Sequence, residues 1–520
     1  MGFGVELDQA NALIGAGRMP EAIALLSRVV AKRPREARAL HMLGVAKAQS
    51  GAQGEAAQLL ERARREAPRD ALILTDLATL KVMTDRAAEA LPLLDKALKL
   101  QPALRQASFY RGVALKNLKR TDEALATFEA LAQQEPANAL YQHNRASLLV
   151  QRGRYDEAEP IVERLLARDA TAVPVLLVKS LILARRKQLN EAIALCDDVL
   201  ARAPGYEEAR YNRGLFKLLN GDLPSGWRDH ESRWKRPGYP DPSPTPTIPV
   251  WQGEAINGRS ILVYCEQGFG DSLHFCRYAG ELAAMGADVT LLAPRPLVRL
   301  LQTLSDKVRV VGAIDNEQGF DFQIALLSLP HRCNTDLTNI PHRVPYLAVE
   351  PDRVTRWKDA IGAQGFKIGI AWQGNPQADF DKTRSIALRE YLPLSQIAGV
   401  RLISLQKNFG AEQIKTLPGE MKVETLGDDF DAGPDAFLDT AAVMQHLDLV
   451  VAPNTAIAHL AGALARPVFI PLDVDSDWRW LLERTDSPWY PTAKLFRQQT
   501  RGDWVTVFEA IANDVRSRLA

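Results

Sequence analysis

The sequence predicts an α-helical solenoid followed by an α/β part that consists of two doubly wound halves. Three observations predict this fold class: a repeat with a period of 34 residues, a proline-rich stretch after it, and an alternation of short apolar runs with helical stretches in the rest of the chain. At 520 residues the chain is long enough for about three domains of roughly 100 to 200 residues each. We expect the solenoid over residues 1–235, a linker over 236–250, and the two halves over 251–355 and 356–520.

The repeat is visible as three columns of residues. A Glu-Ala pair recurs with a period of 34, a proline marks the end of most units, and a small residue occupies a third position. A small residue lets the two helices of a hairpin approach closely, whereas a proline ends the second helix before the next unit begins. The Glu-Ala pairs begin at residues 21, 55, 89, 123, 157 and 191, the prolines are Pro34, Pro68, Pro102, Pro136 and Pro204, and the small residues are Ala10, Gly44, Ala78, Gly112, Ala146, Ser180 and Gly214.

This pattern resembles the tetratricopeptide repeat over residues 4 to 235. Because each unit buries its apolar face only against its neighbours, the resemblance implies a right-handed solenoid whose concave groove binds a protein partner. In O-GlcNAc transferases, whose solenoid is similar, an asparagine ladder in one column holds the backbone of the acceptor peptide. Asn144 and Asn212 are the asparagines of that column here, which makes them the candidate acceptor-groove residues. The remaining positions favour an ordinary solvated helix face for the column: Asp8, Met42, Asp76, Tyr110 and Val178.

The solenoid is expected to end at SGWRDHESRWK, where Ser225 and Gly226 replace the Glu-Ala pair, as is usual for a capping repeat. The segment RPGYPDPSPTPTIPV that follows contains six prolines. Such a composition favours an extended, semi-rigid chain, so we expect a spacer between the solenoid and the α/β part.

The composition indicates which kinds of partner and which cellular compartment to expect for this protein. Lys plus Arg amount to 64 against 63 Asp plus Glu, so no overall charge favours nucleic acid or an anionic membrane. No stretch reaches the roughly 18 apolar residues of a membrane span, and the N-terminus lacks the features of a signal peptide. Four cysteines without CxxC spacing are typical of buried thiols in a reducing compartment. We therefore expect a cytoplasmic protein with no nucleic-acid partner, no membrane insertion, no disulfide and no structural zinc.

From residue 251 onward, short apolar runs rich in β-branched residues alternate with helical stretches, and the alternation begins again near residue 367. This βαβ pattern predicts parallel sheets in two Rossmann-like halves, with a ligand cleft at the carboxyl ends of the strands. The predicted strands are residues 261–265, 288–293, 308–311 and 321–327 in the first half, and 367–372, 400–405, 447–452 and 467–472 in the second.

The stretch EQGFGDSLHF, residues 266–275, joins the first predicted strand to a helix. It lacks the third glycine of a dinucleotide-binding GxGxxG and the GK[ST] of a phosphate-binding loop, which disfavours both cofactor classes. Gly268 and Gly270 let the backbone come close to a ligand, and Asp271 stands at the start of the helix. Asp271 is either an N-cap or a residue of the site, and its position alone supports both roles.

A series of short motifs carries a second resemblance. They are EQGFGDSLHFCRY, SLP, PYL, GIAWQGNP, KTRSIAL, SLQK, NTAIAHLAGAL, DWRW and SPWYP, in this order. Together they resemble the GT-B glycosyltransferases that bacteria fuse to tetratricopeptide solenoids, which are relatives of the lipopolysaccharide heptosyltransferases. The resemblance spans residues 251–520 and implies a GT-B fold whose last helix crosses back to the first half. It also implies a nucleotide sugar as substrate, with no further cofactor and no bound metal.

By resemblance, the first half holds the acceptor and supplies the general base. Heptosyltransferases carry an aspartate at the glycine-rich turn, and Asp271 matches that place. A serine or threonine hydroxyl is a poor nucleophile until a carboxylate within hydrogen-bond reach takes its proton. Glu266 is the reserve candidate, because a carboxylate engaged in capping is stabilised in its ionised form and is then a weaker base.

The second half is expected to hold the donor. In LVVAPNTAIAHLAGAL a strand leads into a helix, with Asn454 or Thr455 at the cap and free amides that can bind a phosphate. Asn454 stands where heptosyltransferase-like sequences have an acid, so an acidic role is not expected there, and His459 is expected to be an interior structural residue. By resemblance, the other donor-site residues are Lys382 and Arg384 as a phosphate clamp with Lys407 behind them, Gln373, Gly374 and Asn375 along the cleft, and Gln406 near the base or ribose.

Two further predictions concern the C-terminal region. The run DVDSDW contains the DxD pairs of Asp473, Asp475 and Asp477, but the resemblance to a metal-independent fold favours a solvated turn. The last residues predict an amphipathic helix, and the aromatic residues before it are expected to pack in a core. Its apolar face holds Trp504, Val507, Phe508, Ile511 and Val515, and the aromatic residues are Trp478, Trp480, Trp489 and Tyr490.

The resemblance implies a protein O-glycosyltransferase: the solenoid recruits a protein, and the cleft transfers a sugar to its serine or threonine. Bacterial flagellin glycosyltransferases that use nucleotide-activated nonulosonic acids, relatives of sialic acid, share this architecture, which favours flagellin as acceptor. An O-GlcNAc-type transferase that uses UDP-GlcNAc is one alternative. A non-catalytic repeat scaffold with a degenerate transferase part is another, motivated by Asn454 and the interrupted asparagine column. A lipopolysaccharide heptosyltransferase is disfavoured by the long solenoid and the absence of a basic membrane-facing run.

Overall fold

The computed structural model describes residues 3–236, 239, 244, 247–314, 319–376 and 384–520, and much of the predicted linker lies outside this set. The chain divides into two compact units, Met1–Ile182 and Leu183–Ala520. The first unit holds most of the solenoid, whereas the second holds the last repeats together with the α/β part. This division falls earlier than residue 235, where the sequence pattern predicted the end of the solenoid.

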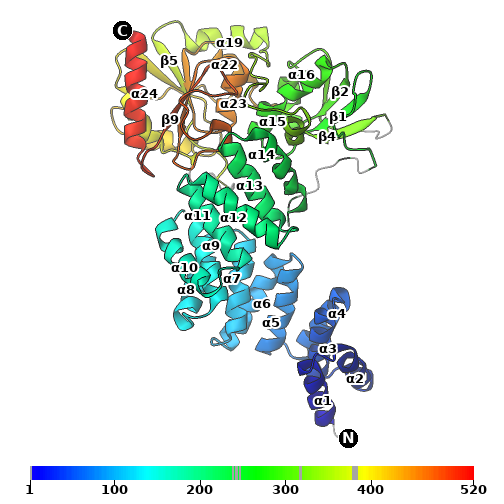
Figure 1. Cartoon of the computed structure of the whole chain (residues 1–520). Coiled ribbons are helices and arrows are strands. Elements are labelled where there is room, and N and C mark those ends of the chain that lie inside the picture. Colours follow the sequence, from blue (N-terminus) through cyan, green and yellow to red (C-terminus); the bar gives the residue numbers. More distant parts are fainter. Residues whose placement is uncertain (1–2, 237–238, 240–243, 245–246, 315–318, 377–383) are drawn as a thin grey trace. The chain divides into compact units, whose positions relative to one another are not determined.

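The first unit consists of helices that pair into hairpins, and successive hairpins stack on one another (Figure 1). The predicted helical solenoid is therefore confirmed. Its helices are α1 (Phe3–Gly15), α2 (Met19–Lys32), α3 (Ala37–Gln49), α4 (Gln53–Glu66), α5 (Ala71–Met83), α6 (Ala87–Leu100), α7 (Arg105–Asn117), α8 (Thr121–Gln134), α9 (Ala139–Gln151), α10 (Tyr155–Arg168) and α11 (Val173–Arg185), whose last residues belong to the second unit.

The column of small residues marks the closest approach of the two helices in a hairpin. A Cβ atom at Gly44 would lie 2.8 Å from Leu60 Cγ, and one at Gly112 would lie 2.7 Å from Phe128 Cε2. Real Cβ atoms do not come so close to other heavy atoms, so a larger side chain would force the helices apart. The structure thus confirms the role that the sequence predicts for this column.

The turn inside each hairpin has a left-handed backbone conformation that recurs with the repeat. Glycine occupies this position in some units and a residue with a Cβ atom in others, where the conformation is strained. The residues with positive φ are Gly17, Gly51, Asp85, Lys119, Gly153, Lys187 and Gly221.

The last repeats pack as part of the second unit. Their helices are α12 (Leu189–Arg202), α13 (Glu207–Leu219) and α14 (Leu223–His230), followed by the 3₁₀ helix η1 (Glu231–Lys235). Trp227 of α14 is 1% exposed, and its ring centroid lies 5.0 Å from that of Trp478 and 6.4 Å from that of Phe275. Because these aromatic partners belong to the α/β part, the capping repeat shares their core.

The first half of the α/β part contains a parallel sheet of four strands in the order β3-β2-β1-β4. Each strand overlaps one of the four apolar runs that predicted it. The strands are β1 (Ser260–Tyr264), β2 (Asp288–Leu292), β3 (Val308–Val311) and β4 (Phe322–Ala325), and the helices are α15 (Phe269–Phe275), α16 (Arg277–Ala284), η2 (Arg295–Leu297), α17 (Val298–Leu301), η3 (Leu326–Ser328) and α18 (Leu329–Arg332).

The second half contains a parallel sheet of five strands in the order β6-β5-β7-β8-β9. Four of the strands overlap predicted runs, and the edge strand β9 was not predicted. The strands are β5 (Phe366–Ile370), β6 (Val400–Ser404), β7 (Leu449–Val451), β8 (Val468–Leu472) and β9 (Ala493–Arg497), and the helices are α19 (Pro351–Ile361), η4 (Leu388–Tyr391), α21 (Leu392–Ser395), η5 (Ala411–Thr416), α22 (Leu438–Met444), α23 (Ala456–Ala463), η6 (Trp478–Trp480) and α24 (Trp504–Leu519).

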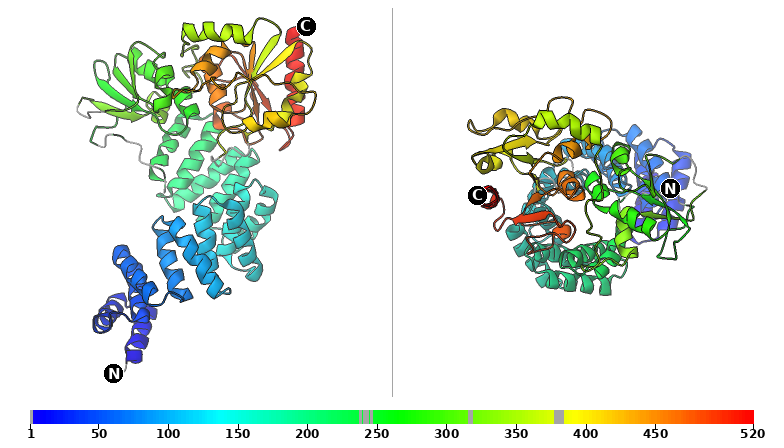
Figure 2. Two further views of the ribbon diagram at one scale, coloured as in Figure 1. Left: turned by 180° about the vertical axis from the view of Figure 1, so that it is seen from behind. Right: turned by 90° about the horizontal axis from the view of Figure 1, so that it is seen from above.

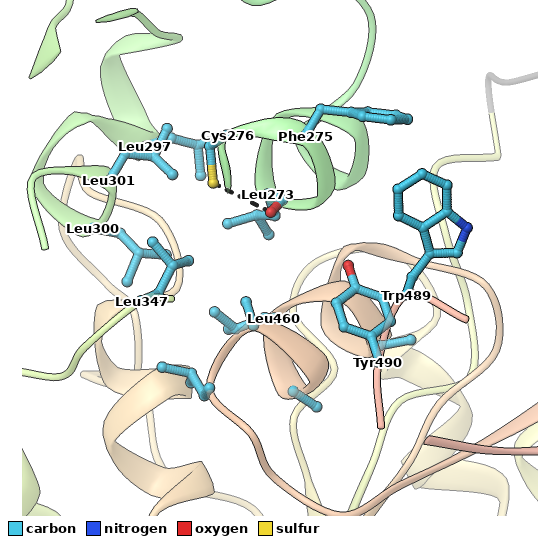
Figure 3. Close-up of a cluster of buried hydrophobic side chains, with 14 of the residues drawn as sticks. Leu273, Phe275, Cys276, Leu297, Leu300, Leu301, Leu347, Leu460, Trp489 and Tyr490 are labelled. Carbon is cyan, nitrogen blue, oxygen red and sulfur yellow. Dashed lines mark hydrogen bonds between the residues drawn. The ribbon is translucent and has the colours of Figure 1, made fainter. Parts of the chain in front are cut away.

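A continuous apolar core joins the two halves (Figure 3). Leu273 of α15 and Leu460 of α23 are both fully buried in it, together with Trp489 and Tyr490 from the connection between β8 and β9. The aromatic residues of this connection are buried, as the sequence predicts. Burial of large apolar side chains on this scale stabilises the contact between the halves by several kcal/mol, at about 25 cal/mol for each Å² of apolar surface removed from water.

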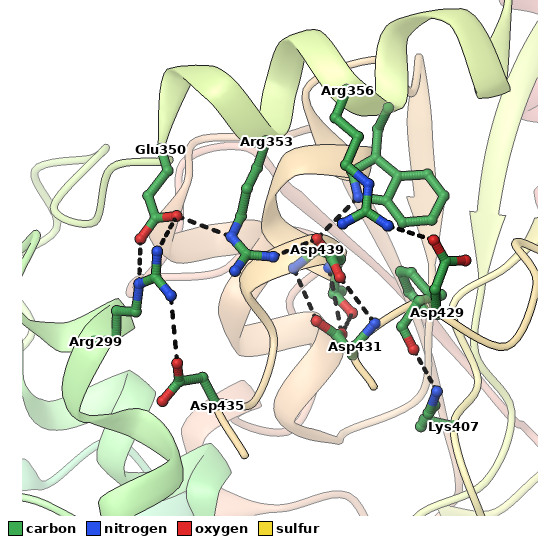
Figure 4. A network of polar contacts seen from close by, with 12 residues as sticks. Arg299, Glu350, Arg353, Arg356, Lys407, Asp429, Asp431, Asp435 and Asp439 are labelled. Carbon is green, nitrogen blue, oxygen red and sulfur yellow. Dashed lines mark hydrogen bonds and ion pairs between the residues drawn. The ribbon is translucent and has the colours of Figure 1, made fainter. Parts of the chain in front are cut away.

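A polar network joins the halves as well (Figure 4). Arg299 Nε of α17 lies 2.6 Å from Glu350 Oε1, and Glu350 Oε2 lies 2.8 Å from Arg353 Nε of α19. Arg353 Nη1 in turn lies 2.7 Å from Asp439 Oδ1 of α22, whose side chain is 4% exposed. The pair that links the halves, Arg299 and Glu350, is partly exposed, and exposed ion pairs are worth about 1 kcal/mol or less. The more buried pair of Arg353 and Asp439 holds α19 against α22 within the second half.

The last helix, α24, packs against the second half. Val507, Phe508, Ile511 and Val515 are buried among residues of β5, β7 and β8, which confirms the predicted apolar face. The views agree that α24 lies on the side of its sheet away from the first half (Figure 1, Figure 2). The predicted crossing back of the last helix is therefore wrong. The β8–β9 connection reaches the first half instead, because its aromatic side chains are buried there.

Relief of strain in one hairpin turn should stabilise the protein. Lys187 is exposed and has a φ of 61°, so replacement by glycine removes the Cβ that disfavours this conformation. We expect Lys187→Gly to raise the free energy of unfolding by about 0.5 to 1 kcal/mol, measured by chemical denaturation. The control Lys187→Ala keeps the Cβ and should leave stability unchanged. Equal effects of the two variants would contradict this account.

Candidate functional site

The candidate site lies where α15 and α23 begin, after the carboxyl ends of β1 and β7. A Cβ atom at Gly270 would lie 3.2 Å from His459 Cδ2 and 3.7 Å from the Cα of Ala456. Glycine at this position therefore allows the first turns of the two helices, one from each half, to come together. The backbone at Gly270 approaches the second half of the chain, whereas the sequence suggested an approach to a ligand.

Asp271 is fixed by two hydrogen bonds. Its Oδ2 accepts a hydrogen bond from the backbone N–H of Gly268 at 3.1 Å, and its Oδ1 lies 2.5 Å from Arg479 Nη2. Gly268 is the N-cap of α15 and Asp271 is the third residue of the helix, so the predicted N-cap position of Asp271 is wrong. The carboxylate still caps the helix, because it reaches back to the N-cap amide. Its side chain is 21% exposed and remains open to solvent.

The environment of Asp271 moves its pKa in the direction that suits a base. Burial raises the pKa of this carboxyl above its ordinary value, although the Arg479 guanidinium and the Gly268 amide oppose the shift, and Asp477 adds to it. The sequence suggested that capping would leave a weakly basic carboxylate. The structure differs because desolvation outweighs the hydrogen bonds, and a higher pKa makes the carboxylate a stronger base.

Glu266 is enclosed by partners. Its Oε1 lies 2.8 Å from Arg233 Nη2 and accepts a hydrogen bond from the Leu327 amide at 3.2 Å, and its Oε2 accepts one from the Tyr239 hydroxyl at 2.9 Å. The side chains of Glu266 and Arg233 are 2% and 0% exposed. Arg233 also donates to Ser328 Oγ at 2.7 Å. This pair ties η1 of the capping repeat to the first half, and Asp271 is the more accessible of the two candidate carboxylates.

On the second half, the N-terminus of α23 presents groups suited to an anion. Thr455 is the N-cap but makes no side-chain capping bond, and its hydroxyl has no hydrogen-bond partner among the described residues although it is 9% exposed. Arg384 Nη1 donates to the backbone oxygen of Asn454 at 3.0 Å, which places a guanidinium beside this turn. A helix N-terminus with a nearby cation is a general anion-binding arrangement.

The other predicted donor-site residues have mostly structural contacts. Gln406 Oε1 accepts from the amides of Trp372 and Gln373 at 2.9 and 3.1 Å, and its Nε2 donates to the Gln373 and Phe409 oxygens. Its carboxamide thus braces the loops after β5 and β6, which leaves the predicted contact with a base or ribose without support. Lys407 donates to the backbone oxygen of Phe430 (Figure 4). Gly374 and Asn375 lie in the loop after β5, and Lys382 lies outside the described residues.

The candidate acceptor-groove residues are buried. Asn144 and Asn212 are 7% and 8% exposed, and Asn144 Nδ2 donates to the backbone oxygen of Leu140 within its own helix. Val178 of the same column is 4% exposed. The predicted solvated face is therefore wrong for these three positions, because the side chains are packed inside their repeats.

Arg479 is the residue of the site that the sequence motifs did not single out. It lies in DWRW, where its side chain is 8% exposed and its guanidinium carbon lies 4.2 Å from the Trp478 ring centroid. Asp477 accepts from its Nη1 at 3.0 Å. An arginine between two buried tryptophans was the available signal, since a guanidinium so placed needs a carboxylate partner.

The predicted solvated turn at DVDSDW is wrong. The Asp475 side chain is 5% exposed and pairs with Arg501 and, at 3.8 Å, with Arg185. Asp473 is 9% exposed. Arginines provide the compensating charge here, and within the described residues no group of three or more His, Cys, Asp or Glu side chains could hold a metal ion.

Beneath the site, two histidines share one tyrosine hydroxyl. Tyr490 Oη lies 2.9 Å from His274 Nδ1 and 3.0 Å from His459 Nδ1. Burial lowers the pKa of both histidines well below the ordinary value, so both are neutral near pH 7. His459 is thus an interior residue, in agreement with the sequence prediction.

Comparison with known proteins identifies the repeats. Residues 7–71, 75–139 and 143–207 match the family model of the tetratricopeptide repeat. This segment is a tetratricopeptide-repeat array. The helical hairpins of the first unit agree with that assignment.

The chain is also similar to a curated protein over a longer stretch. It is 27% identical to Protein FlbA of Caulobacter vibrioides over 360 residues, which cover 63% of this chain and 59% of FlbA. The chain therefore spans about three fifths of the length of this relative. Because the matched segment covers 63% of this chain, it is longer than the repeat array, and it therefore includes residues of the α/β part.

Three solved structures that match parts of the chain all have low TM-scores. A structure of MamA (MSR-1) is 28% identical and covers 32% of this chain and 97% of its own, with a TM-score of 0.30. YrrB, described as a TPR protein with an unusual peptide-binding site, is 23% identical over 34% of this chain and 90% of its own, with a TM-score of 0.30. A repeat protein from Parabacteroides merdae is 19% identical over 45% and 92%, with a TM-score of 0.38. In the described part of the chain, no helix has the length and apolar character needed to cross a membrane.

Removal of Arg233 should destabilise the second unit strongly. Arg233→Ala leaves the Glu266 carboxylate buried without its cation, and we expect a loss of about 3 to 5 kcal/mol in the free energy of unfolding. Chemical denaturation provides the measurement. Arg228→Ala is the matched control, because Arg228 is an exposed arginine of the same repeat, and its replacement should change stability by no more than about 0.5 kcal/mol. A similar small effect of Arg233→Ala would show that the buried pair is not required.

Proposed function

We propose that this chain is a protein O-glycosyltransferase of the GT-B type. Its repeat array recruits a protein, and the α/β part transfers a sugar from a nucleotide-sugar donor to a serine or threonine of that protein. The observation that carries the proposal is the meeting of α15 and α23 at Gly270. Asp271 follows Gly270 in the first half, and Thr455, whose hydroxyl is unpartnered among the described residues, precedes Ala456 in the second, so the two residues belong to adjoining helix turns. The Arg384 guanidinium lies beside Asn454 at the same turn of the second half. A base and an anion site on facing halves are what glycosyl transfer needs.

The chemistry requires one proton transfer and one exchange of bonds. Asp271 accepts the proton of the acceptor hydroxyl while the hydroxyl oxygen forms a bond to the anomeric carbon of the sugar. The bond between that carbon and the donor phosphate oxygen breaks, and the nucleotide leaves as a phosphate anion. The first turn of α23 and Arg384 stabilise the negative charge that develops on the leaving group. The proton stays on Asp271 until it is lost to solvent, to which the carboxyl is open.

The identities proposed for the acceptor and the donor rest on the resemblance to known families. The repeat array supports a protein acceptor, because such arrays present extended surfaces for binding. The resemblance to flagellin glycosyltransferases favours flagellin, with a nonulosonic acid carried by a cytidine nucleotide. An O-GlcNAc-type reaction with UDP-GlcNAc uses the same groups, and addition of mass to a protein from that donor alone would favour it. The four cysteines are free thiols, which suits action in the cytoplasm.

A non-catalytic scaffold is the second candidate, and one observation favours it. Both oxygens of Asp271 have partners, since Oδ1 lies against Arg479 and Oδ2 against the Gly268 amide. A carboxylate so engaged could be purely structural. The two candidates differ in whether Asp271 is needed for turnover.

Replacement of Asp271 distinguishes the candidates. Asp271→Asn keeps an oxygen for the Gly268 amide but cannot accept a proton at neutral pH, so we expect transfer to fall by roughly 100-fold or more. Donor binding should be unchanged, because the phosphate is held by the second half. The measurement is the mass added to purified flagellin in the presence of a cytidine-linked nonulosonic acid, and the control is Asp222→Asn, which alters the capping aspartate of α14. Normal transfer by Asp271→Asn would exclude Asp271 as the base.

Arg384 should contribute to donor affinity. We expect Arg384→Gln to weaken the binding of a nucleotide monophosphate or diphosphate by about 10-fold or more, since a charge-assisted hydrogen bond is worth about 1.5 to 3 kcal/mol. The rise in melting temperature with added nucleotide measures this affinity. Arg389→Gln is the matched control, because the Arg389 side chain is 75% exposed on the surface of the same half. An unchanged melting shift in Arg384→Gln would remove Arg384 from the donor site.

A further inference from the structure

Three charged side chains are paired with one another at the candidate site. Arg479 Nη2 lies 2.5 Å from Asp271 Oδ1, and Arg479 Nη1 lies 3.0 Å from each oxygen of Asp477. Asp271 belongs to α15 of the first half, whereas the other two belong to the β8–β9 connection of the second. One guanidinium is therefore shared by two carboxylates, and it links the proposed base to the opposite half.

The surroundings hold Arg479 in this place. Its backbone amide donates to Asp477 Oδ1 at 2.9 Å, and its guanidinium carbon lies 4.2 Å from the Trp478 ring and 5.4 Å from the Phe275 ring. The Arg479 side chain is 8% exposed, compared with 27% for Asp477 and 21% for Asp271. A surface arginine would lose much of its freedom on pairing, whereas this one is already fixed by aromatic contacts and by its pair with Asp477.

Few other charges face Asp271. Arg384 lowers the pKa of the Asp271 carboxyl less than Arg479 does, and Asp477 raises it. Cys265 precedes the helix as a thiol whose pKa burial raises to about 12, so it is neutral near pH 7. His274 and His459 beneath the site are neutral as well, because burial lowers their pKa. Arg479 and Asp477 are thus the main charged neighbours of Asp271, and they shift its pKa in opposite directions.

We propose that Arg479 and Asp477 are positioning residues of the transfer site. Arg479 fixes the Asp271 carboxylate in place, and Asp477 shares this cation, so both residues determine how readily Asp271 accepts a proton. The inference rests on the proposed function, because the two residues act on the proposed base of that reaction.

The two residues should act in opposite directions on the acid limb of the pH profile. Without the Arg479 cation the ionised form of Asp271 loses its stabilising partner, so its pKa rises and the base works only at higher pH. Without the Asp477 charge, repulsion of the Asp271 carboxylate falls and Arg479 is available to Asp271 alone. The pKa of Asp271 then falls, and the acid limb moves to lower pH.

The experiment is a profile of kcat/KM against pH for the full chain, with the protein acceptor and the donor that show transfer. We expect the acid limb to move up by about one pH unit in Arg479→Gln and down by about half a unit in Asp477→Asn. Arg479→Lys retains the cation and should keep the limb near that of the unmodified protein, even where kcat falls. The control Arg484→Gln changes an exposed arginine of the same connection, paired with Asp486, and should not move the limb. Coincident limbs in all four variants would overturn the inference while the proposed function stands.

A second measurement does not need turnover. The free energy of unfolding is measured against pH for each protein with and without Asp271→Asn, and the difference isolates the titration of Asp271. The folded-state pKa of Asp271 is raised, so its ionisation reduces stability as pH rises through the unfolded and then the folded pKa. We expect Arg479→Gln to extend this loss to higher pH and Asp477→Asn to shorten it. Absence of transfer by the unmodified protein would refute the proposed function, whereas identical stability profiles would refute the pairing.

Discussion

The architecture of the α/β part depends on the close approach of α15 and α23 at Gly270. With no Cβ there, the first turn of one half lies against His459 and Ala456 of the other. Beneath this contact, the Tyr490 hydroxyl lies within hydrogen-bond distance of a histidine from each half. One apolar core continues from the first half into the second. A Cβ at position 270 would lie 3.2 Å from His459 Cδ2, so the His459 ring or the turns would have to shift by a few tenths of an ångström. The absence of a side chain at Gly270 thus permits the close contact of the two turns.

Much of the fold could be predicted because its signals are local. Each repeat contacts mainly its neighbours, so the period of 34 residues is enough to predict the hairpins and the tight packing at positions such as Gly112. Of the nine strands in the described part of the chain, eight coincide with apolar runs, since strands buried on both faces need continuous apolar sequence. The edge strand AKLFR was missed because an edge strand carries alternating polar residues and follows no such pattern.

The site could be predicted only in part, because its contacts are not local. Asp271 was identified from the motif around it, but its partner Arg479 lies more than two hundred residues further along the chain, and no spacing rule connects them. For the same reason the sequence did not reveal that Glu266 is buried against Arg233, because this contact depends on how the capping repeat folds onto the first half. The proline-rich segment suggested a boundary near residue 235, yet composition does not reveal which unit buries Trp227.

The burial of Trp227 against residues near the end of the chain has a consequence for how the protein is made. The early repeats complete their contacts with neighbours as they leave the ribosome. The ring of Trp227 packs against Trp478 and Trp489, which follow it by about 250 residues, or about 10 to 50 s of synthesis at roughly 5 to 20 residues per second. During that interval the capping repeat exposes an apolar surface that later belongs to the core. The last repeat of the array is therefore finished only when the α/β part is nearly complete.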